Sequence, residues 1–143
     1  MRKLCVLIVD DSPVFLNAAR DFVASLPEVE CVECENSSAE ALSKAAEFPA
    51  DLVLMDIVMP GMNGLETMQV LRSRFPALPM YAVTLCDAAA YRAAALESGA
   101  VDLISKTEFA TAIPDLIAQL ARDRKTGTDH VFPSENVVCP LKA

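Results

Sequence analysis

The stretch Leu4-Cys5-Val6-Leu7-Ile8-Val9-Asp10-Asp11-Ser12-Pro13 decides the fold of this 143-residue chain. Six apolar residues in an unbroken run are typical of a β-strand that is buried on both faces. Ser12 followed by Pro13 predicts the start of a helix, because serine caps helices and proline suits the first helical position. A buried strand, two carboxylates and a helix start together indicate the first unit of a parallel α/β sheet.

The same pattern returns along the chain. Apolar runs at 52–55, 80–83 and 101–104 are followed by Asp56, Thr84 and Lys106. A shorter and more polar run at 29–32 predicts an edge strand. Helical patterns occupy the intervals, at residues 13–26, 39–48, 65–75, 88–97 and 112–120. Five strand-helix repeats predict an α/β, doubly wound, five-stranded parallel sheet with strand order 2-1-3-4-5.

The length of the chain is that of one domain and a short extension. We expect residues 1–122 to form the domain and residues 123–143 to form a C-terminal tail or linker with no output domain. Pro133 and Pro140 argue against a helix in the extension, although several of its residues are apolar.

Charge and hydropathy exclude some classes of protein. The formal net charge is −8, with 12 Lys and Arg against 20 Asp and Glu, so we expect no nucleic acid contact by this chain. No apolar run reaches the roughly 18 residues of a membrane span. The first strand is too short for the core of a signal peptide, and we expect a cytoplasmic protein without a membrane partner.

The five cysteines are Cys5, Cys31, Cys34, Cys86 and Cys139. Cys31-Val32-Glu33-Cys34 has the spacing of a redox motif, but the pair lies at a predicted strand end rather than at a helix N-terminus. The other three are isolated from one another in sequence, so no zinc ligand set is indicated. We expect buried, reduced thiols.

The polar residues at the strand ends predict a phosphoryl-transfer site. Asp10, Asp11 and Asp56 should meet at the carboxyl edge of the sheet, and an oxygen-only ligand set suits Mg²⁺, or Mn²⁺. Asp56 could attack phosphorus as a nucleophile, with Lys106 and Thr84 contacting the phosphoryl oxygens. Taken alone, Asp11 could be a helix cap and Thr84 a residue selected for β-propensity.

At these residues the sequence resembles the response-regulator receiver domains of two-component signalling, which have a flavodoxin-like (βα)5 fold. The resemblance covers residues 4–121 and rests on Val9-Asp10-Asp11-Ser12, the segment from Leu54 to Gly64, Thr84, Ser98-Gly99-Ala100 and Lys106. It implies that Asp56 is the phosphoacceptor. It also implies a metal site made of Asp10, Asp11, the Asp56 carboxylate and the Val58 backbone carbonyl, and switch residues Thr84 and Lys106.

The resemblance further implies the partners and the output. We expect Mg²⁺-dependent phosphoryl transfer from a sensor histidine kinase or a phosphotransfer protein, followed by a change on the surface of the fourth helix, fifth strand and fifth helix. The residues expected on that partner surface are Ala88, Tyr91, Arg92 and Leu103. A downstream effector or a missing output domain would bind the changed surface. A phosphorylation-dependent homodimer is one possible outcome. We expect a self-phosphorylating switch that could hydrolyse its own phosphoryl group, not an enzyme.

Some positions depart from the family pattern. Leu103, three residues before the lysine, stands where the family usually carries an aromatic switch residue. Leu85 replaces a small residue beside the entrance to the site. Val58 and Cys86 flank the site in the family, and neither suits the orientation of a hydrolytic water, so we expect a long-lived phosphoryl group.

Other interpretations remain. The chain could be the truncated receiver of a DNA-binding regulator, or a protein-interaction module that works without phosphorylation. A haloacid-dehalogenase-like phosphatase needs a second acid two residues after its nucleophile, and Val58 stands there instead. A flavodoxin-like FMN protein would carry a hydroxyl- and glycine-rich phosphate loop after the first strand, where this chain is acidic.

Overall fold

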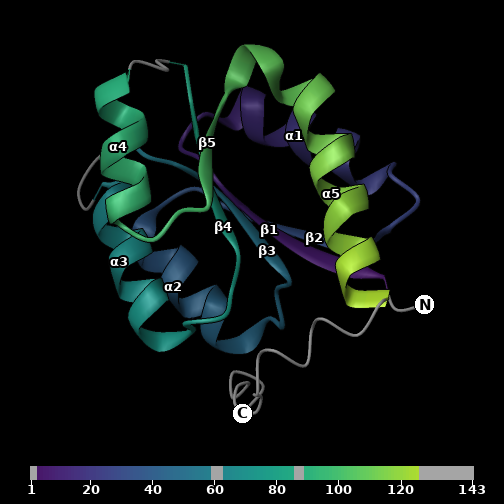
Figure 1. Ribbon diagram of the computed structural model, residues 1–143, viewed down its shortest axis with the longest axis horizontal. Helices are drawn as coiled ribbons and strands as arrows, with labels where there is room; N and C mark the ends of the chain where they lie inside the picture. The colour runs from purple at the N-terminus through teal and green to yellow at the C-terminus, as the bar shows by residue number, and fades with distance from the viewer. Residues whose placement is uncertain (1–2, 59–62, 86–88, 126–143) are drawn as a thin grey trace.

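A computed structural model of the chain describes residues 3–58, 63–85 and 89–125 (Figure 1). Its five strands form one parallel sheet in the order β2-β1-β3-β4-β5. The predicted fold class, strand order and edge position of the second strand are therefore confirmed. The predictions for the extension from residue 126 onward, and for Cys86 and Ala88, lie outside the described residues.

Strands and helices alternate along the chain. The strands are β1 (Leu4–Val9), β2 (Val29–Glu35), β3 (Leu52–Asp56), β4 (Met80–Thr84) and β5 (Asp102–Ser105). The helices are α1 (Pro13–Ala24), α2 (Ser38–Glu47), α3 (Gly64–Arg74), α4 (Ala89–Glu97) and α5 (Phe109–Lys125), with a 3-10 turn, η1 (Lys106–Glu108), before the last.

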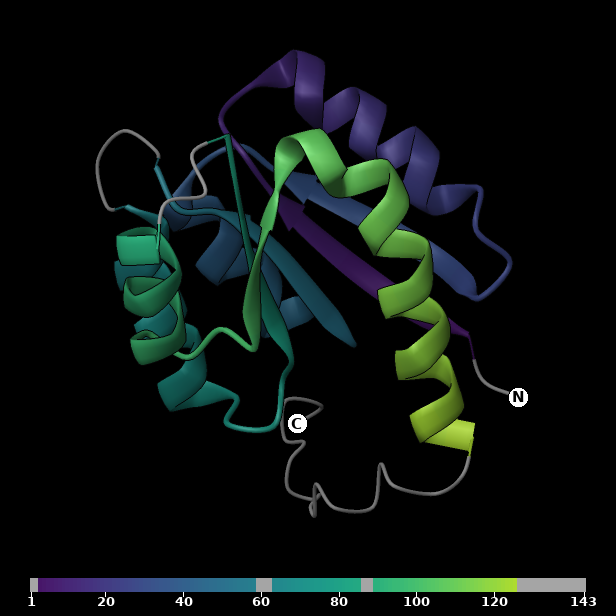
Figure 2. The same ribbon diagram turned by 45° about the horizontal axis from the view of Figure 1, so that its top comes forward.

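Helices cover both faces of the sheet. α1 and α5 lie on one face, and α2, α3 and α4 lie on the other (Figures 1 and 2). Successive residues of a strand point to opposite faces, so β1 divides its side chains between two cores. Ile8 packs on the α1 and α5 side, whereas Leu7 packs on the α2, α3 and α4 side. The unbroken apolar runs of the sequence follow from this double burial.

Local signals mark the beginnings and ends of the helices, and the predicted cap at Ser12 is present. The Ser12 hydroxyl accepts a hydrogen bond from Phe15 N at 3.3 Å and caps α1. The side chain of Asn63 accepts from Glu66 N at 3.0 Å and caps α3. Gly99 follows α4 with φ of +116°, a conformation that side chains rarely adopt. No helix in the described part of the chain is long and apolar enough to cross a membrane.

Two elements extend beyond their predicted limits. β2 continues to Glu35 because its polar residues pair with β1 up to Val9. α5 begins at Phe109 instead of Ala112, since η1 leads directly into it and Phe109 packs in the core. It ends at Lys125, past the predicted last residue Leu120.

Gly64 sits where the start of α3 crosses the end of β3. A Cβ at Gly64 would lie 2.1 Å from the backbone oxygen of Asp56 and 2.6 Å from the Cα of Ile57. Both atoms belong to the backbone and cannot rotate away. Glycine is therefore required for α3 to approach the strand that ends in Asp56.

We expect Gly64→Ala to lower the free energy of unfolding by about 2–3 kcal/mol, because overpacking against backbone forces the two elements apart. In thermal unfolding this corresponds to a fall of roughly 10 °C. Ser73→Ala, at an exposed position of the same helix, should change little. An unchanged Gly64→Ala midpoint would contradict the close approach.

Candidate functional site

Three carboxylates gather at the carboxyl edge of the sheet. Asp10 follows β1, Asp11 comes next, and Asp56 ends β3. Each offers one oxygen atom, and these oxygens all lie within 4.8 Å of one another. Asp10 and Asp56 are 1% and 6% exposed, whereas Asp11 is open to solvent. The parallel arrangement of β1 and β3 brings together acids that are 45 residues apart in the sequence (11 to 56).

Backbone N–H groups orient the two buried carboxylates. Ser12 N donates to Oδ1 of Asp10 at 2.8 Å, and Val58 N donates to Oδ1 of Asp56 at 3.0 Å. The Oδ2 atoms of the same two residues face Lys106. Each carboxylate therefore has one oxygen held by its own loop and one turned toward the centre of the site.

Lys106 supplies the positive charge. Its Nζ lies 2.7 Å from Oδ2 of Asp10 and 3.5 Å from Oδ2 of Asp56. The ammonium also lies 4.4 Å from the centroid of the Phe15 ring, in a cation–π contact. Phe15 in turn packs edge-on against Phe109, with ring centroids 5.3 Å apart. Aromatic packing between α1 and α5 thus holds the lysine over the acids.

Thr84 is the last residue of β4 and is 3% exposed. It is opposite Ser105 in the ladder with β5, and Val83 before it is opposite Asp56 in the ladder with β3. Thr84 therefore ends the strand that lies next to β3, the strand that ends in Asp56. Leu85, the next residue, is 73% exposed.

The site carries an excess of negative charge. Burial raises the pKa of the Asp56 carboxyl, the Val58 N–H lowers it, and the neighbouring Asp10 raises it more than Lys106 lowers it. Three carboxylates face a single ammonium in this part of the site. A further cation would relieve their mutual repulsion.

The donor set fits a divalent metal. Oδ2 of Asp10 is buried and, although 2.7 Å from the lysine ammonium, has no well-directed hydrogen bond. Among the described residues the cluster consists of carboxylates alone, which hard cations such as Mg²⁺ prefer over thiolate or imidazole donors. The acidic cluster could therefore hold a metal ion. The role of the Val58 carbonyl as a ligand stays a prediction.

The predicted partner surface is only partly exposed. Tyr91 is 38% exposed, and the guanidinium of Arg92 on α4 forms an ion pair with Asp102 on β5. Leu103 is 4% exposed and packs in the core on the α2, α3 and α4 side. Its placement on the partner surface is therefore corrected: its side chain points from β5 into that core.

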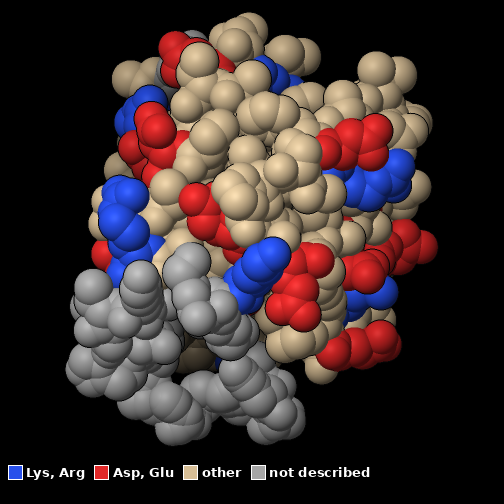
Figure 3. Space-filling model, turned by 90° about the vertical axis from the view of Figure 1, so that its right-hand side faces the viewer, with Lys and Arg blue, Asp and Glu red and all other residues tan. Residues whose placement is uncertain are grey.

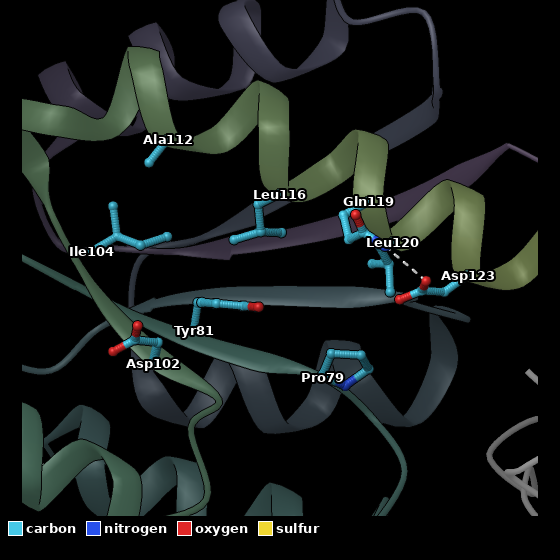
Figure 4. A pocket seen from close by; sticks show the side chains of 9 residues that line it. All are labelled: Pro79, Tyr81, Asp102, Ile104, Ala112, Leu116, Gln119, Leu120 and Asp123. Carbon is cyan, nitrogen blue, oxygen red and sulfur yellow. Dashed lines mark hydrogen bonds between the residues drawn. The ribbon is translucent and has the colours of Figure 1, made fainter. Parts of the chain in front are cut away.

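A pocket lies between α5 and the sheet. It has a volume of about 310 Å³ and is lined by Pro79, Tyr81, Asp102, Ile104, Ala112, Leu116, Gln119, Leu120 and Asp123 (Figure 4). The ring of Tyr81 lies beneath Leu116 there. Burial raises the pKa of the Tyr81 hydroxyl, and Asp102 adds to the effect. None of the lining residues belongs to the acidic cluster.

Acidic and basic side chains are interspersed on the side of the molecule that carries α1 and α5 (Figure 3). In that view the described surface shows no continuous basic area.

Comparison with known proteins identifies a family. The family model described as "Response regulator receiver domain" matches residues 6–118. The response regulator domain of Thermotoga maritima CheB superimposes with a TM-score of 0.76 at 29% identity, over 85% of this chain and 98% of that one. The receiver domain of a putative response regulator NarL from Mycobacterium tuberculosis also gives 0.76, at 25% identity, over the same shares of the two chains.

Curated relatives include enzymes and regulators. The chain is 36% identical over 107 residues to a protein-glutamate methylesterase/protein-glutamine glutaminase of Geobacillus kaustophilus, covering 74% of this chain and 31% of the relative. It is 36% identical over 102 residues to the response regulator GacA of Pseudomonas syringae, covering 71% and 47%. The chain thus spans about a third to a half of the length of these relatives.

These relatives contradict the prediction that the chain is a switch and not an enzyme. Several of the matching proteins are named as methylesterases and glutaminases. The similarity covers only about a third of their length. The matched residues therefore do not distinguish this chain from the corresponding part of a methylesterase/glutaminase.

We expect Asp56→Asn to stabilise the metal-free protein at neutral pH by about 1 kcal/mol, or roughly 4 °C, because it removes a desolvated charge beside Asp10. The raised pKa of Asp56 sets the pH dependence. Above that pKa the ionised wild-type carboxylate lowers stability, and as the pH falls through it the wild type binds a proton and the difference shrinks.

Thermal unfolding between pH 4 and pH 8 in a chelating buffer measures this difference. Asp21→Asn is the control, because Asp21 is exposed on α1. A variant less stable than the wild type at pH 8 would show that the ionised Asp56 carboxylate does not lower the stability of the protein.

Proposed function

The chain belongs to the response regulator receiver domain family, and we propose that Asp56 accepts a phosphoryl group from a sensor histidine kinase or a phosphotransfer protein. The observation that carries this proposal is the placement of Asp56. Its carboxylate is buried, held through one oxygen by Val58 N and turned through the other toward Lys106. A carboxylate held in this way is directed toward the centre of the site, and in its ionised form it needs no general base.

The transfer exchanges one bond to phosphorus for another. A carboxylate oxygen of Asp56 forms the new P–O bond while the P–N bond to the donor imidazole breaks, and the imidazole leaves with the bonding electrons and takes up a proton. Asp10, Asp11, Asp56 and the Val58 carbonyl would hold Mg²⁺, or Mn²⁺, which when bound neutralises charge on the phosphoryl oxygens.

Lys106 and Thr84 would receive the transferred group. The ammonium already lies 3.5 Å from Oδ2 of Asp56 and needs only to exchange its contact with Asp10 for a phosphoryl oxygen. The buried Thr84 ends the neighbouring strand β4 and carries a hydroxyl that can donate a hydrogen bond to another oxygen. Both residues would thereby sense whether Asp56 carries a phosphoryl group.

We propose that α4, β5 and α5 transmit this change to a partner. The Arg92–Asp102 ion pair ties α4 to β5, and Tyr91 on the same helix is half-exposed. Leu103 would couple Thr84 to α4 by packing, since it is buried beneath that helix and has no aromatic ring to swing outward. Phosphorylation then biases an existing equilibrium between two packings.

The partner would be a downstream effector or an output domain, with a phosphorylation-dependent homodimer as one arrangement. The relatives include both enzymes and regulators longer than this chain. We propose the cytoplasm as the compartment, where a kinase domain would meet the acidic site. The domain boundary at residue 122 stays a prediction; the last helix is described as far as Lys125.

Incubation with Mg²⁺ and acetyl phosphate should add one phosphoryl group, seen by intact-mass spectrometry. We expect Asp56→Asn and excess chelator each to abolish the added mass, because the first removes the nucleophile and the second leaves the negative charges unscreened.

Asp21→Asn, at an exposed aspartate of α1, is the matched control and should be phosphorylated like the wild type. Full phosphorylation of Asp56→Asn would overturn the proposal. No phosphorylation of the wild type, despite bound Mg²⁺, would favour an interaction module that works without phosphorylation.

The phosphoryl group should be long-lived, since Val58 next to the site offers no polar side chain to orient a water molecule. Its side chain is 57% exposed. We expect Val58→Asn to accelerate loss of the phosphoryl group by roughly tenfold, within the range of positioning effects in catalysis.

Mass spectrometry of the purified phosphoprotein at intervals in Mg²⁺ buffer measures the rate at which the phosphoryl group is lost. Val101→Asn, at an equally exposed valine just before β5, should leave the decay unchanged. Equal rates for all three proteins would refute the role of Val58.

A further inference from the structure

Two thiols that are far apart in sequence lie opposite each other in the sheet. Cys5 of β1 is paired in register with Cys31 of β2, at the end of the ladder where the strands begin. The preceding pair is Leu4 with Val29, so Glu30 is an extra residue at a bulge. Without this bulge Glu30 would oppose Cys5. The bulge therefore puts the two thiols on the same face of the sheet.

The two sulfur atoms are in direct contact. The Cys31 thiol donates to Sγ of Cys5, and the two Sγ atoms are 2.9 Å apart. Neighbouring strands lie about 4.8 Å apart, which is within the Cα separation of roughly 4.4–6.8 Å that a disulfide spans. A bond between these sulfurs would thus require no rearrangement of the strands.

The two cysteines differ in access to solvent. Cys5 is 8% exposed, and its backbone N–H donates to Oδ2 of the buried Asp51 at 2.8 Å. Burial, followed by the contact with Cys31, raises the pKa of the Cys5 thiol to about 12. Cys31 is half-buried and lies on β2, an edge strand of the sheet. Cys31 is therefore the thiol that a small oxidant reaches first.

Cys34 is not part of this pair, although it completes the Cys-x-x-Cys spacing. It is opposite Ile8 in the ladder and packs against the core beneath α1 and α5. Cys5 is on the opposite face of β1, because it has the same parity as Leu7, which packs on the α2 and α3 side. Cys34 thus serves as an internal control for the reactivity of a half-buried thiol on β2.

We propose that Cys5 and Cys31 form a redox modification site, at which a peroxide converts the two thiols into a disulfide that links β1 to β2. The Cys31 sulfur attacks one oxygen of the peroxide, giving a sulfenic acid and one molecule of water. The Cys5 sulfur then attacks the Cys31 sulfur and releases a second water. In total two thiols lose two electrons and two protons, and hydrogen peroxide is reduced to two waters.

The link would close the segment that carries part of the acidic site. Residues 5–31 include β1 from Cys5 onward, Asp10, Asp11 and the whole of α1 with Phe15. A cross-link between the ends of this segment restricts the unfolded chain and stabilises the strand that presents Asp10. Oxidation would therefore raise the thermal stability of the protein without using any residue of the phosphoryl-transfer site.

The test treats the full-length protein with a few equivalents of hydrogen peroxide and blocks remaining thiols with an alkylating agent. Cleavage after glutamate separates Cys31 from Cys34, because Glu30 and Glu33 flank the first and Glu33 and Glu35 flank the second. We expect a linked peptide pair containing Cys5 and Cys31, lighter by two hydrogen atoms than the separate peptides, and its loss on reduction with dithiothreitol.

Cys31→Ser should abolish the link, and Cys34→Ser should retain it. Circular dichroism verifies that both variants are folded, and the substitution of the half-buried Cys31 avoids disturbing the buried position 5. The thermal midpoint should rise on oxidation in the wild type and in Cys34→Ser, and not in Cys31→Ser. A link between Cys31 and Cys34, or sulfinic acid at Cys31 without any link, would overturn the proposal.

Discussion

The contact between the Lys106 ammonium and the buried Asp10 and Asp56 carboxylates is the interaction on which the site depends. Nζ of Lys106 lies 2.7 Å from Oδ2 of Asp10 and 3.5 Å from Oδ2 of Asp56. Burial of two like charges is costly unless a cation is near, and one ammonium does not balance them. The charges of the site therefore remain unbalanced, and a metal ion could supply the missing positive charge.

The rest of the fold supports this arrangement from a distance. Gly64 allows α3 to approach the end of β3 without displacing Asp56. Phe15 and Phe109 pack together and hold the lysine from the other side. The helices thus contribute to the chemistry through packing, since it is their contacts with the strand ends that fix where the charged groups lie.

The pair of thiols lies at the end of the sheet opposite to the acidic cluster. Cys5 and Cys31 meet where β1 and β2 begin, whereas the acids meet where β1 and β3 end. One strand, β1, belongs to both sites. A covalent link at one end of β1 would constrain the segment that carries Asp10 and Asp11, so the two sites share a structural element without sharing a residue.

The sequence by itself determined the strand-helix order, the strand ends that carry Asp10, Asp56, Thr84 and Lys106, and the cap at Ser12, because these depend on local periodicity and on residues close in the chain. Register, burial and contacts across the sheet were decided only by the tertiary structure. No local sequence pattern predicts the bulge at Glu30, which places Cys31 opposite Cys5 in the ladder. The burial of Leu103 beneath α4 likewise followed from which face of β5 that helix covers, and a strand pattern cannot distinguish the two faces when both are apolar.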